Sequence, residues 1–358
     1  MQTHAVHDRV LEFIHGSSTA CFGMLALEVF AHQFEMIPAY RRVCEARRQT
    51  PDTVADWRRI PPVPTLAFKR VDLCCAPADR IFLTTGTTEG ADHRGRHAMP
   101  DLRLYRDASM TAMKELVFPD VDRIRVLSLI APAADRPESS LAQMADWALN
   151  VYGTDASGGF VRGGILDFES FAEALREAAH SGEPVCILTT TAALIRFFDR
   201  CRDEGWSFRL SHGSRLMDTG GDKGAPRVLS RNGLLHAVWQ TFAIPGYFCV
   251  NEYGMAELSS QFYDNVIRDR VAGRFSYRAK IGPAWTRTRV IHPETLDDTE
   301  DGEPGLLCHV DLANAGTALA VLTEDIGRTV ADGFELLGRA KGAETRGCSL
   351  ALAEFTAI

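Results

Sequence analysis

The sequence lacks the cysteine spacing that a disulfide framework or a zinc ribbon requires. Its nine cysteines are odd in number and include no C-x-x-C pair, so reduced thiols are expected. It also lacks any run of about 18 consecutive apolar residues, which argues against a membrane-spanning helix. The segment from Met1 to His15 has no uninterrupted apolar core of the kind found in signal peptides. Together these absences predict a cytoplasmic protein without a membrane span.

Long runs of basic residues are also missing. The formal net charge is -8 and the sequence pI is about 5.8, and no basic run or stripe suggests a nucleic-acid surface. Hydrophobic residues make up 46% and charged residues 24% of the 358 residues, an ordinary globular composition. The acidic total remains compatible with a nucleotide, because a nucleotide needs only a local cationic pocket.

Strands and helices alternate through the middle of the chain. The apolar runs predict strands at 126–130, 185–188, 216–217 and 248–250, and helices at 141–152, 168–179 and 229–241, with another helix through 194–198. Asp167 is the expected N-cap of the second of these helices. This alternation predicts an α/β fold in which mostly parallel sheets are flanked by helices. Ligands of such folds bind at the carboxyl ends of the strands.

The two ends of the chain have a different texture. Residues 20–48 predict one long amphipathic helix, or two in succession interrupted at Pro38, and Pro-rich residues 60–64 predict an extended connector. After about residue 285 the segments are short and β-rich. We expect an α/β core over residues 1–284, a β-rich subdomain of the same core over 285–337, and a short tail over 338–358.

A threonine-rich loop follows the apolar residues at 81–83. It reads Phe82-Leu-Thr-Thr-Gly-Thr-Thr-Glu-Gly90, and its central residues are Thr84, Thr85, Gly86, Thr87 and Thr88. Small residues let backbone N–H groups approach a phosphate, and the hydroxyls add further donors. The loop is not a G-x-x-x-x-G-K-S/T loop, because no Lys-Ser/Thr pair follows. It therefore predicts phosphate binding, and a polar hairpin turn is the alternative.

A second motif, Asn251-Glu-Tyr-Gly-Met-Ala-Glu257, follows a predicted strand. Tyr253 beside Gly254 can stack on a purine while the backbone passes close to it. Glu257 can hold Mg²⁺ against phosphate oxygens. A strand-to-helix turn with an ordinary surface glutamate is the alternative.

A third motif, Thr323-Glu-Asp-Ile-Gly-Arg328, stands at the end of a predicted β segment. Asp325 can accept hydrogen bonds from both ribose hydroxyls of a nucleotide. A polar turn between strands is the alternative interpretation.

These motifs resemble, in order and spacing, the phosphate, adenine and ribose motifs of the adenylate-forming superfamily. By this resemblance Asn251 also contacts the nucleotide, Gly220 and Gly221 border adenine and the acyl pocket, and Arg339 reaches phosphate. Lys341 lies near the hinge position. The resemblance implies a site that uses ATP and Mg²⁺, with Glu257 as a catalytic, metal-binding carboxylate.

Within this superfamily the chain resembles the acyl-protein synthetases of the LuxE type. The resemblance rests on the string from Ile60 to Lys69, on Gly254-Met-Ala-Glu-Leu258 and on the ending Arg346-Gly-Cys-Ser-Leu350, and it extends over most of the chain. Because the chain ends soon after Arg339, the resemblance implies the large N-terminal domain of the superfamily without its full C-terminal lid domain.

That family activates a fatty acid as acyl-AMP and holds the acyl group as a thioester on a cysteine near the C-terminus. The resemblance implies activation of a fatty or other apolar carboxylic acid, transfer to Cys348, and delivery to an acyl-acceptor protein such as an acyl reductase. One alternative is an acid–CoA or acid–carrier-protein ligase with an external thiol. Another is a non-catalytic homologue used for binding. Cys348 can also be a small apolar residue of a terminal strand, and the other cysteines are interpreted as structural.

The chain departs from the superfamily at two places. The lysine usual just beyond the phosphate loop is missing, and Arg94 or Arg96 is expected to supply the cation. Ala256 replaces a threonine, which removes one hydroxyl contact to phosphate. His93 and His97 flank the loop and are interpreted as surface residues, with orientation of the substrate as the alternative.

Overall fold

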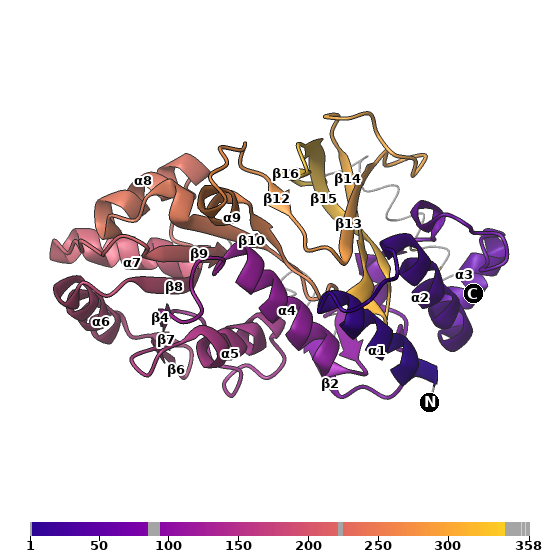
Figure 1. Cartoon of the computed structure of the whole chain (residues 1–358), viewed down its shortest axis with the longest axis horizontal. Coiled ribbons are helices and arrows are strands. Elements are labelled where there is room, and N and C mark those ends of the chain that lie inside the picture. The colour runs from indigo at the N-terminus through magenta and orange to yellow at the C-terminus, as the bar shows by residue number, and fades with distance from the viewer. Residues whose placement is uncertain (1, 85–93, 221–224, 341–351, 353–354, 356–358) are drawn as a thin grey trace. The chain divides into compact units, whose positions relative to one another are not determined.

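The computed structural model describes residues 2–84, 94–220 and 225–340, together with Leu352 and Phe355. The chain forms two compact units (Figure 1). Unit 1 comprises Met1–Thr111, Met255–Gln261 and Ala279–Ile358, and unit 2 comprises Ala112–Gly254 and Phe262–Arg278. The domain boundaries expected from the sequence stay a prediction. Among the described helices, none combines the length and apolar character that crossing a bilayer requires.

Unit 2 is built on parallel strands. Its strands lie in the order β5 (Gly158–Gly159), β4 (Arg125–Ser128), β8 (Val185–Thr190), β9 (Arg215–Thr219), β10 (Cys249–Tyr253) and β11 (Phe262–Asp264). All neighbours are parallel except β11, which is antiparallel to β10. Residues of β4 and β9 are buried along their whole length, as expected where helices cover both faces of a sheet.

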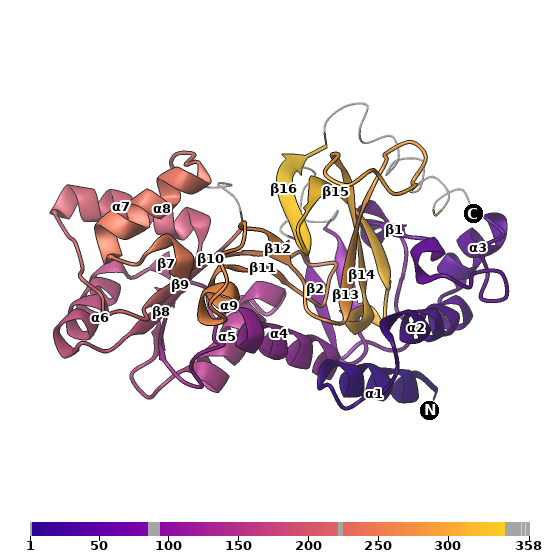
Figure 2. The same ribbon diagram turned by 45° about the horizontal axis from the view of Figure 1, so that its top comes forward.

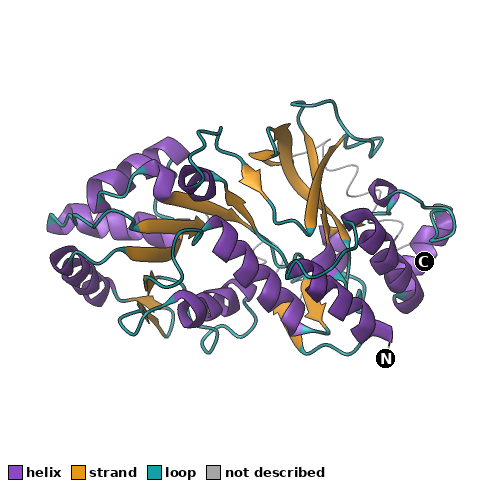
Figure 3. Ribbon diagram, viewed as in Figure 1, coloured by secondary structure: helices purple, strands orange, loops and turns teal. Residues whose placement is uncertain are grey.

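Helices separate the strands of unit 2 along the chain. They are α5 (Ser140–Tyr152), α6 (Phe168–Ser181), α7 (Thr191–Glu204), α8 (Arg231–Phe242) and the short α9 (Val266–Val271), and they lie on either side of the strands (Figure 3). The Asp167 carboxylate accepts a hydrogen bond from the Ser170 N–H at 3.1 Å, which confirms the predicted N-cap. A small hairpin, β6 (Val161–Arg162) and β7 (Ile165–Leu166), precedes α6, and a 3₁₀ turn, η4 (Gly246–Phe248), precedes β10.

Helices open the chain in unit 1. They are α1 (Gln2–Ile14), α2 (Phe22–Met36) and α3 (Pro38–Ala46). The later helix α4 (Leu102–Leu116) begins in unit 1 and ends in unit 2. The predicted helical stretch at 20–48 is two helices, because Ile37 is extended and Pro38 begins α3. The sequence analysis did not predict α1 or α4. Short 3₁₀ turns occur as η1 (Trp57–Arg59), η2 (Thr65–Lys69) and η5 (Leu312–Asn314).

The remaining part of unit 1 is rich in antiparallel strands. β13 (Thr286–Ile291), β14 (Gly305–Asp311), β15 (Ala320–Val330), β16 (Gly333–Arg339) and β12 (Lys280–Ile281) follow one another as antiparallel neighbours, and β1 (Val63–Pro64) pairs in parallel with β15. Figure 2 shows β13 to β16 side by side. β2 (Arg80–Leu83) and β3 (Arg96–Met99) form a separate antiparallel pair. This arrangement confirms the β-rich texture predicted after residue 285.

An ion pair with a fully buried guanidinium and a partly exposed carboxylate stabilises the sheet of unit 2. Arg215 on β9 is fully buried, and its guanidinium donates to the two Asp120 carboxylate oxygens at 2.6 and 2.9 Å. It also donates to the Val117 carbonyl at 2.9 Å. Removing one partner of a buried pair leaves a charge that neither water nor a counter-ion compensates.

We expect Asp120→Ala to lower the free energy of unfolding by about 3 kcal/mol, because it leaves the buried Arg215 unpaired. Glu169→Ala is the matched control, since Glu169 pairs with Arg200 at the same 2.6 Å, but on the surface. That control is expected to change stability little. Urea unfolding of both variants measures the difference, and equal losses would contradict the role of burial.

Candidate active site

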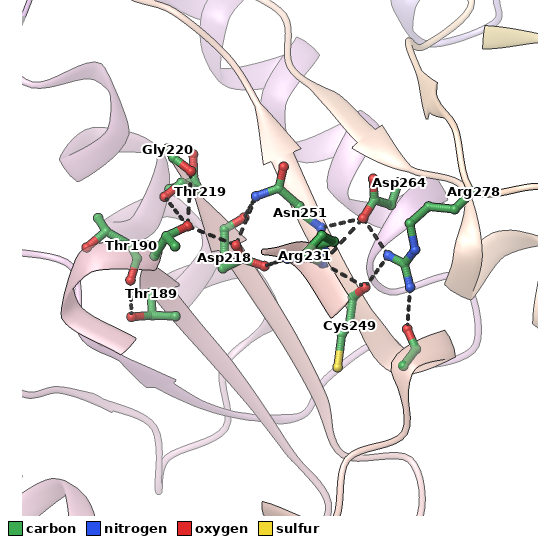
Figure 4. Close-up of polar contacts among 12 residues, drawn as sticks. Thr189, Thr190, Asp218, Thr219, Gly220, Arg231, Cys249, Asn251, Asp264 and Arg278 are labelled. Atoms are coloured by element: carbon green, nitrogen blue, oxygen red, sulfur yellow. Dashed lines mark hydrogen bonds and ion pairs between the residues drawn. The ribbon is translucent and has the colours of Figure 1, made fainter. Parts of the chain in front are cut away.

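The carboxyl ends of β9 and β10 carry a buried network of polar side chains (Figure 4). At its centre is Asp218 on β9, whose side chain is fully buried. One carboxylate oxygen accepts from the Thr191 hydroxyl and from the Asn251 side-chain amide, each at 2.9 Å, and the other accepts from Arg231 at 2.6 Å. Asp218 therefore ties the start of α7, directly after β8, to strand β10.

A second carboxylate, Asp264 on β11, completes this network. It accepts from the Asn251 backbone N–H at 2.9 Å, from Arg278 at 2.6 Å and from Arg231 at 3.4 Å. Arg278 also donates to the Gly246 and Cys249 carbonyls at 2.7 and 2.8 Å. Two carboxylates and two guanidinium groups are thus joined by hydrogen bonds, and Asp264 fixes the backbone of Asn251. These charged residues were not predicted from the sequence, because they are far apart in it and belong to no motif.

The predicted nucleotide residues of unit 2 stand beside this network. Gly220 follows β9 with φ of +75°, which favours glycine, and its carbonyl accepts from the Thr191 hydroxyl at 3.0 Å. Tyr253 is buried, with its ring centroid 6.0 Å from that of Phe262, and Gly254 is exposed. Unit 2 therefore brings Gly220, Asn251 and Tyr253 to the ends of adjacent strands, as expected for a ligand site of a parallel sheet.

In unit 1, the Glu257 carboxylate lies next to the base of the threonine-rich loop, Thr84 and Gly95, which we call the phosphate loop for its predicted role. A Cβ atom on Gly95 would stand 3.6 Å from Glu257 Oε1 and 2.9 Å from Thr84 Cγ2, so the close approach of these three residues requires glycine at 95. Burial raises the pKa of Glu257 to about 7, and the negative charge of Asp325 raises it further, against the opposing effects of its own backbone N–H and of Arg339 and Lys69. A nearby cation favours the ionised form of a carboxyl group, and for a group with this pKa that effect on protonation is largest near neutral pH.

Asp325 and Arg339 form a cross-strand pair. They are direct partners on β15 and β16, and Arg339 Nε lies 3.3 Å from Asp325 Oδ1. Arg339 is largely exposed and also donates to Glu324 at 3.3 Å. Because both Asp325 and Arg339 act electrostatically on Glu257, unit 1 brings these three predicted residues and Thr84 into one region.

The base of the phosphate loop is closed by hydrogen bonds. The Thr84 N–H donates to the Gly95 carbonyl at 2.9 Å, and the Gly95 N–H donates to the Thr84 hydroxyl at 2.8 Å. Arg94 Nε donates to the Thr84 carbonyl at 2.6 Å, so this guanidinium is engaged with the loop backbone, whereas Arg96 is exposed. The other predicted residues lie outside the described residues, namely Thr85, Gly86, Thr87, Thr88, Gly221, Lys341 and Cys348, as does His93.

The interpretation of His97 as a surface residue is wrong. It lies on β3, whose alternating pattern turns His97 and Met99 inward, and its side chain is fully buried. Burial lowers the pKa of His97 to about 4, so its imidazole is neutral at physiological pH. Its ring nitrogens contact the Ala256 carbonyl and the Thr317 hydroxyl.

Comparison with known proteins identifies the family. The family profile described as "Acyl-protein synthetase, LuxE" matches residues 5–356. The chain belongs to the LuxE family of acyl-protein synthetases. This membership confirms the expected class of enzyme, an ATP-dependent, AMP-forming ligase that passes an activated acyl group to a thiol.

Two curated relatives carry the name long-chain-fatty-acid–luciferin-component ligase. The protein from Aliivibrio fischeri is 21% identical over 308 residues, which cover 85% of this LuxE-family chain and 78% of that protein. The protein from Vibrio harveyi is 21% identical over 202 residues, which cover 54% and 51%. These matches agree with the family assignment.

Solved structures confirm the α/β fold expected from the sequence. 2-Hydroxyisobutyryl-CoA ligase, solved with 2-HIB-AMP and CoA, superposes with a TM-score of 0.61 at 16% identity, over 87% of this chain and 73% of that chain. ATP-bound MatB from Rhodopseudomonas palustris superposes with a TM-score of 0.52 at 16% identity, over 74% and 49%. At these identities the likeness concerns the fold.

The residues of unit 1 fit a magnesium ion shared with a nucleotide. Magnesium in such sites is usually held by one or two carboxylates together with substrate phosphates, rather than by a cage of protein ligands. Across the described ranges no group of three or more His, Cys, Asp or Glu side chains could hold a metal. The single carboxylate of Glu257 beside the phosphate loop fits this pattern.

We expect Glu257→Gln to stabilise the magnesium-free protein increasingly as pH rises. The pKa of Glu257 is about 7 when folded and 4.5 in its ordinary state. The folded state therefore keeps a proton that the unfolded chain releases, so the stability associated with this proton is complete below about pH 4.5 and is lost as pH rises through about 7. Glutamine removes that loss, and the variant's Tm advantage should grow to a few degrees at about pH 8.

Thermal unfolding in EDTA between about pH 5 and pH 8 measures this effect. Glu173→Gln, on the exposed face of α6, is the control and should show no such trend. A pH-independent difference between Glu257→Gln and the parent protein would contradict the raised pKa.

Proposed function

We propose that this LuxE-family protein activates a long-chain fatty acid with ATP and Mg²⁺ and passes the acyl group through Cys348 to an acceptor protein. The observation that carries the nucleotide site is the Glu257 carboxylate, with its pKa near 7, at the closed base of the phosphate loop. The choice of a long-chain fatty acid rests on the names of the two curated relatives.

Each residue has a distinct task when ATP binds. Asp325 accepts hydrogen bonds from the ribose hydroxyls, which loosens its 3.3 Å contact with Arg339 and frees that exposed guanidinium for phosphate. Thr84 holds the base of the threonine-rich loop that is proposed to bind the phosphates. The ionised carboxylate of Glu257 would hold Mg²⁺, which would neutralise charge on the phosphate oxygens. In unit 2, Gly220, Asn251 and Tyr253, at the ends of adjacent strands, are the residues proposed for the adenine.

The first step forms the acyl-adenylate. The substrate carboxylate oxygen attacks the α-phosphorus, the bond to the bridging oxygen breaks, and pyrophosphate leaves with the electron pair. The protein contributes position and charge neutralisation rather than covalent chemistry, as in phosphoryl transfer generally. The rigid networks around Asn251 and Glu257 supply that positioning.

In the second step a thiolate attacks the acyl carbon of the acyl-adenylate, the bond from that carbon to the phosphate oxygen breaks, and AMP leaves with the electron pair. Burial argues against most of the cysteines as the attacking thiolate. Thiolates are the attacking species, so a raised pKa disfavours attack. Burial raises the pKa of Cys44, Cys186, Cys201 and Cys249 to about 12 and that of Cys308 to about 11, and it also raises the pKa of Cys74 and Cys75. Cys21 is exposed. The free thiols suit a reducing cytoplasm.

ATP–pyrophosphate exchange tests the first step. We expect exchange that depends on added acid and is strongest for long-chain fatty acids within a panel reaching down to short aryl acids. Glu257→Gln should lower the exchange rate at least about 100-fold, because it removes the charged carboxylate proposed to hold Mg²⁺ at the phosphates. Exchange only with short acids would contradict the substrate class, and silence across the whole panel would favour a non-catalytic binding homologue.

Labelling with a radioactive fatty acid tests the second step. With ATP present, the protein should acquire hydroxylamine-sensitive label, and Cys348→Ser should abolish the label while leaving ATP–pyrophosphate exchange intact. Cys21→Ser is the matched control, because Cys21 is also accessible, and this variant should retain the label. If Cys348→Ser still forms product with CoA or a carrier protein at the parent rate, the acceptor is an external thiol.

A further inference from the structure

The phosphate loop and Glu257 come from distant segments of unit 1, and one buried side chain joins them. His97 is on β3, directly after the loop, and its Nδ1 lies 2.6 Å from the carbonyl oxygen of Ala256. Ala256 immediately precedes Glu257. The contact therefore links the strand that carries the loop to the backbone that carries the carboxylate.

The imidazole of His97 is fixed on all sides. Its Nε2 lies 2.9 Å from the Thr317 hydroxyl, and its ring packs edge-on against Phe68 with centroids 5.7 Å apart. Because a carbonyl only accepts hydrogen bonds, Nδ1 carries the proton and donates to Ala256, and Nε2 accepts from the Thr317 hydroxyl. One tautomer satisfies both contacts, so the ring has a single orientation.

The backbone around Glu257 is held from its other side by Asn314. Its side-chain amide donates to the Glu257 carbonyl at 3.0 Å, and its side-chain oxygen accepts from the Ser259 N–H at 2.8 Å. His97 supplies the matching anchor before Glu257. A site carboxylate is useful only if its supports keep it within about 0.5 Å of its productive position.

We propose that His97 is a positioning residue for the magnesium site, which holds the Ala256 carbonyl and through it places the Glu257 carboxylate beside Thr84 and Gly95. This inference rests on the proposed function, because it assigns His97 to the site that binds MgATP there. His97 touches neither the metal nor the nucleotide in this role. It acts as a support that connects two parts of the site.

Two substitutions at this position separate the two hydrogen bonds. In His97→Asn the side-chain amide nitrogen occupies the place of Nδ1, so the bond to Ala256 can persist while the bond to Thr317 is lost. In His97→Gln the amide reaches the place of Nε2, so the bond to Thr317 can persist while the bond to Ala256 is lost. Thr317→Val is a further control, which removes the hydroxyl and leaves Ala256 bonded.

Binding of ATP at increasing Mg²⁺ concentration, followed by calorimetry, is the decisive measurement. We expect His97→Gln to raise the Mg²⁺ concentration for half-maximal binding about 10- to 100-fold, as for other residues that orient a metal ligand. His97→Asn and Thr317→Val should change it less than about threefold. Thermal unfolding measures the stability that each of the three variants loses. If His97 had only a structural role, variants that lose similar stability would also lose similar affinity for MgATP.

The possible results distinguish the role of His97 from the proposed catalytic function. Equal Mg²⁺ dependence in His97→Asn and His97→Gln would overturn the inference, as would unaltered Mg²⁺ dependence in His97→Gln. If the parent protein binds MgATP but supports no exchange with any acid, the proposed catalytic function fails while the calorimetric comparison still decides the role of His97. If the parent protein binds no ATP at any Mg²⁺ concentration, both proposals are wrong.

Discussion

The backbone that carries Glu257 depends on the hydrogen bonds of a buried carboxylate, that of Asp311. It accepts from the Ser260 N–H at 2.8 Å, the Ser260 hydroxyl at 2.7 Å and the Ala313 N–H at 3.0 Å, and Trp285 donates to that same hydroxyl at 2.9 Å. Burial raises the pKa of Asp311 to about 6. A carboxylate in this setting is tolerated only with its full set of donors, so Asp311 holds Ser260, three residues after Glu257, in place.

The turn that carries Asn314 has its own support in the N-terminal helices. Gln33 on α2 is fully buried, and its amide donates to the Asn314 and Ala315 carbonyls at 2.9 and 3.1 Å while accepting from the Leu319 N–H at 3.0 Å. Every polar group of this glutamine is therefore used. Helix α2 contains no predicted site residue, but it supports the turn that carries Asn314, and Asn314 supports the backbone of Glu257.

The sequence predicted features that are local and missed features that depend on distant partners. Apolar runs identified the strands of unit 2 because parallel strands are buried on both faces, and Asp167 stood at the start of an amphipathic helix, where capping residues occur. No local sequence pattern marks Asp218, Arg231 and Asp264. Their hydrogen bonds form only when β9, α8 and β11 come together in the fold. The burial of His97 could be predicted only from the alternation of inward and outward residues along a short strand. The motif residues outside the described ranges remain predictions.

The Asn251–Glu257 motif has two separate supports, although it is a continuous piece of sequence. The division between the units falls between Gly254 and Met255. Before it, Asp218 and Asp264 hold the backbone and side chain of Asn251. After it, Asn314 and His97 hold the backbone around Glu257. Among the hydrogen bonds described above, the two supports have no partner in common, so additive effects are the expectation for substitutions in them.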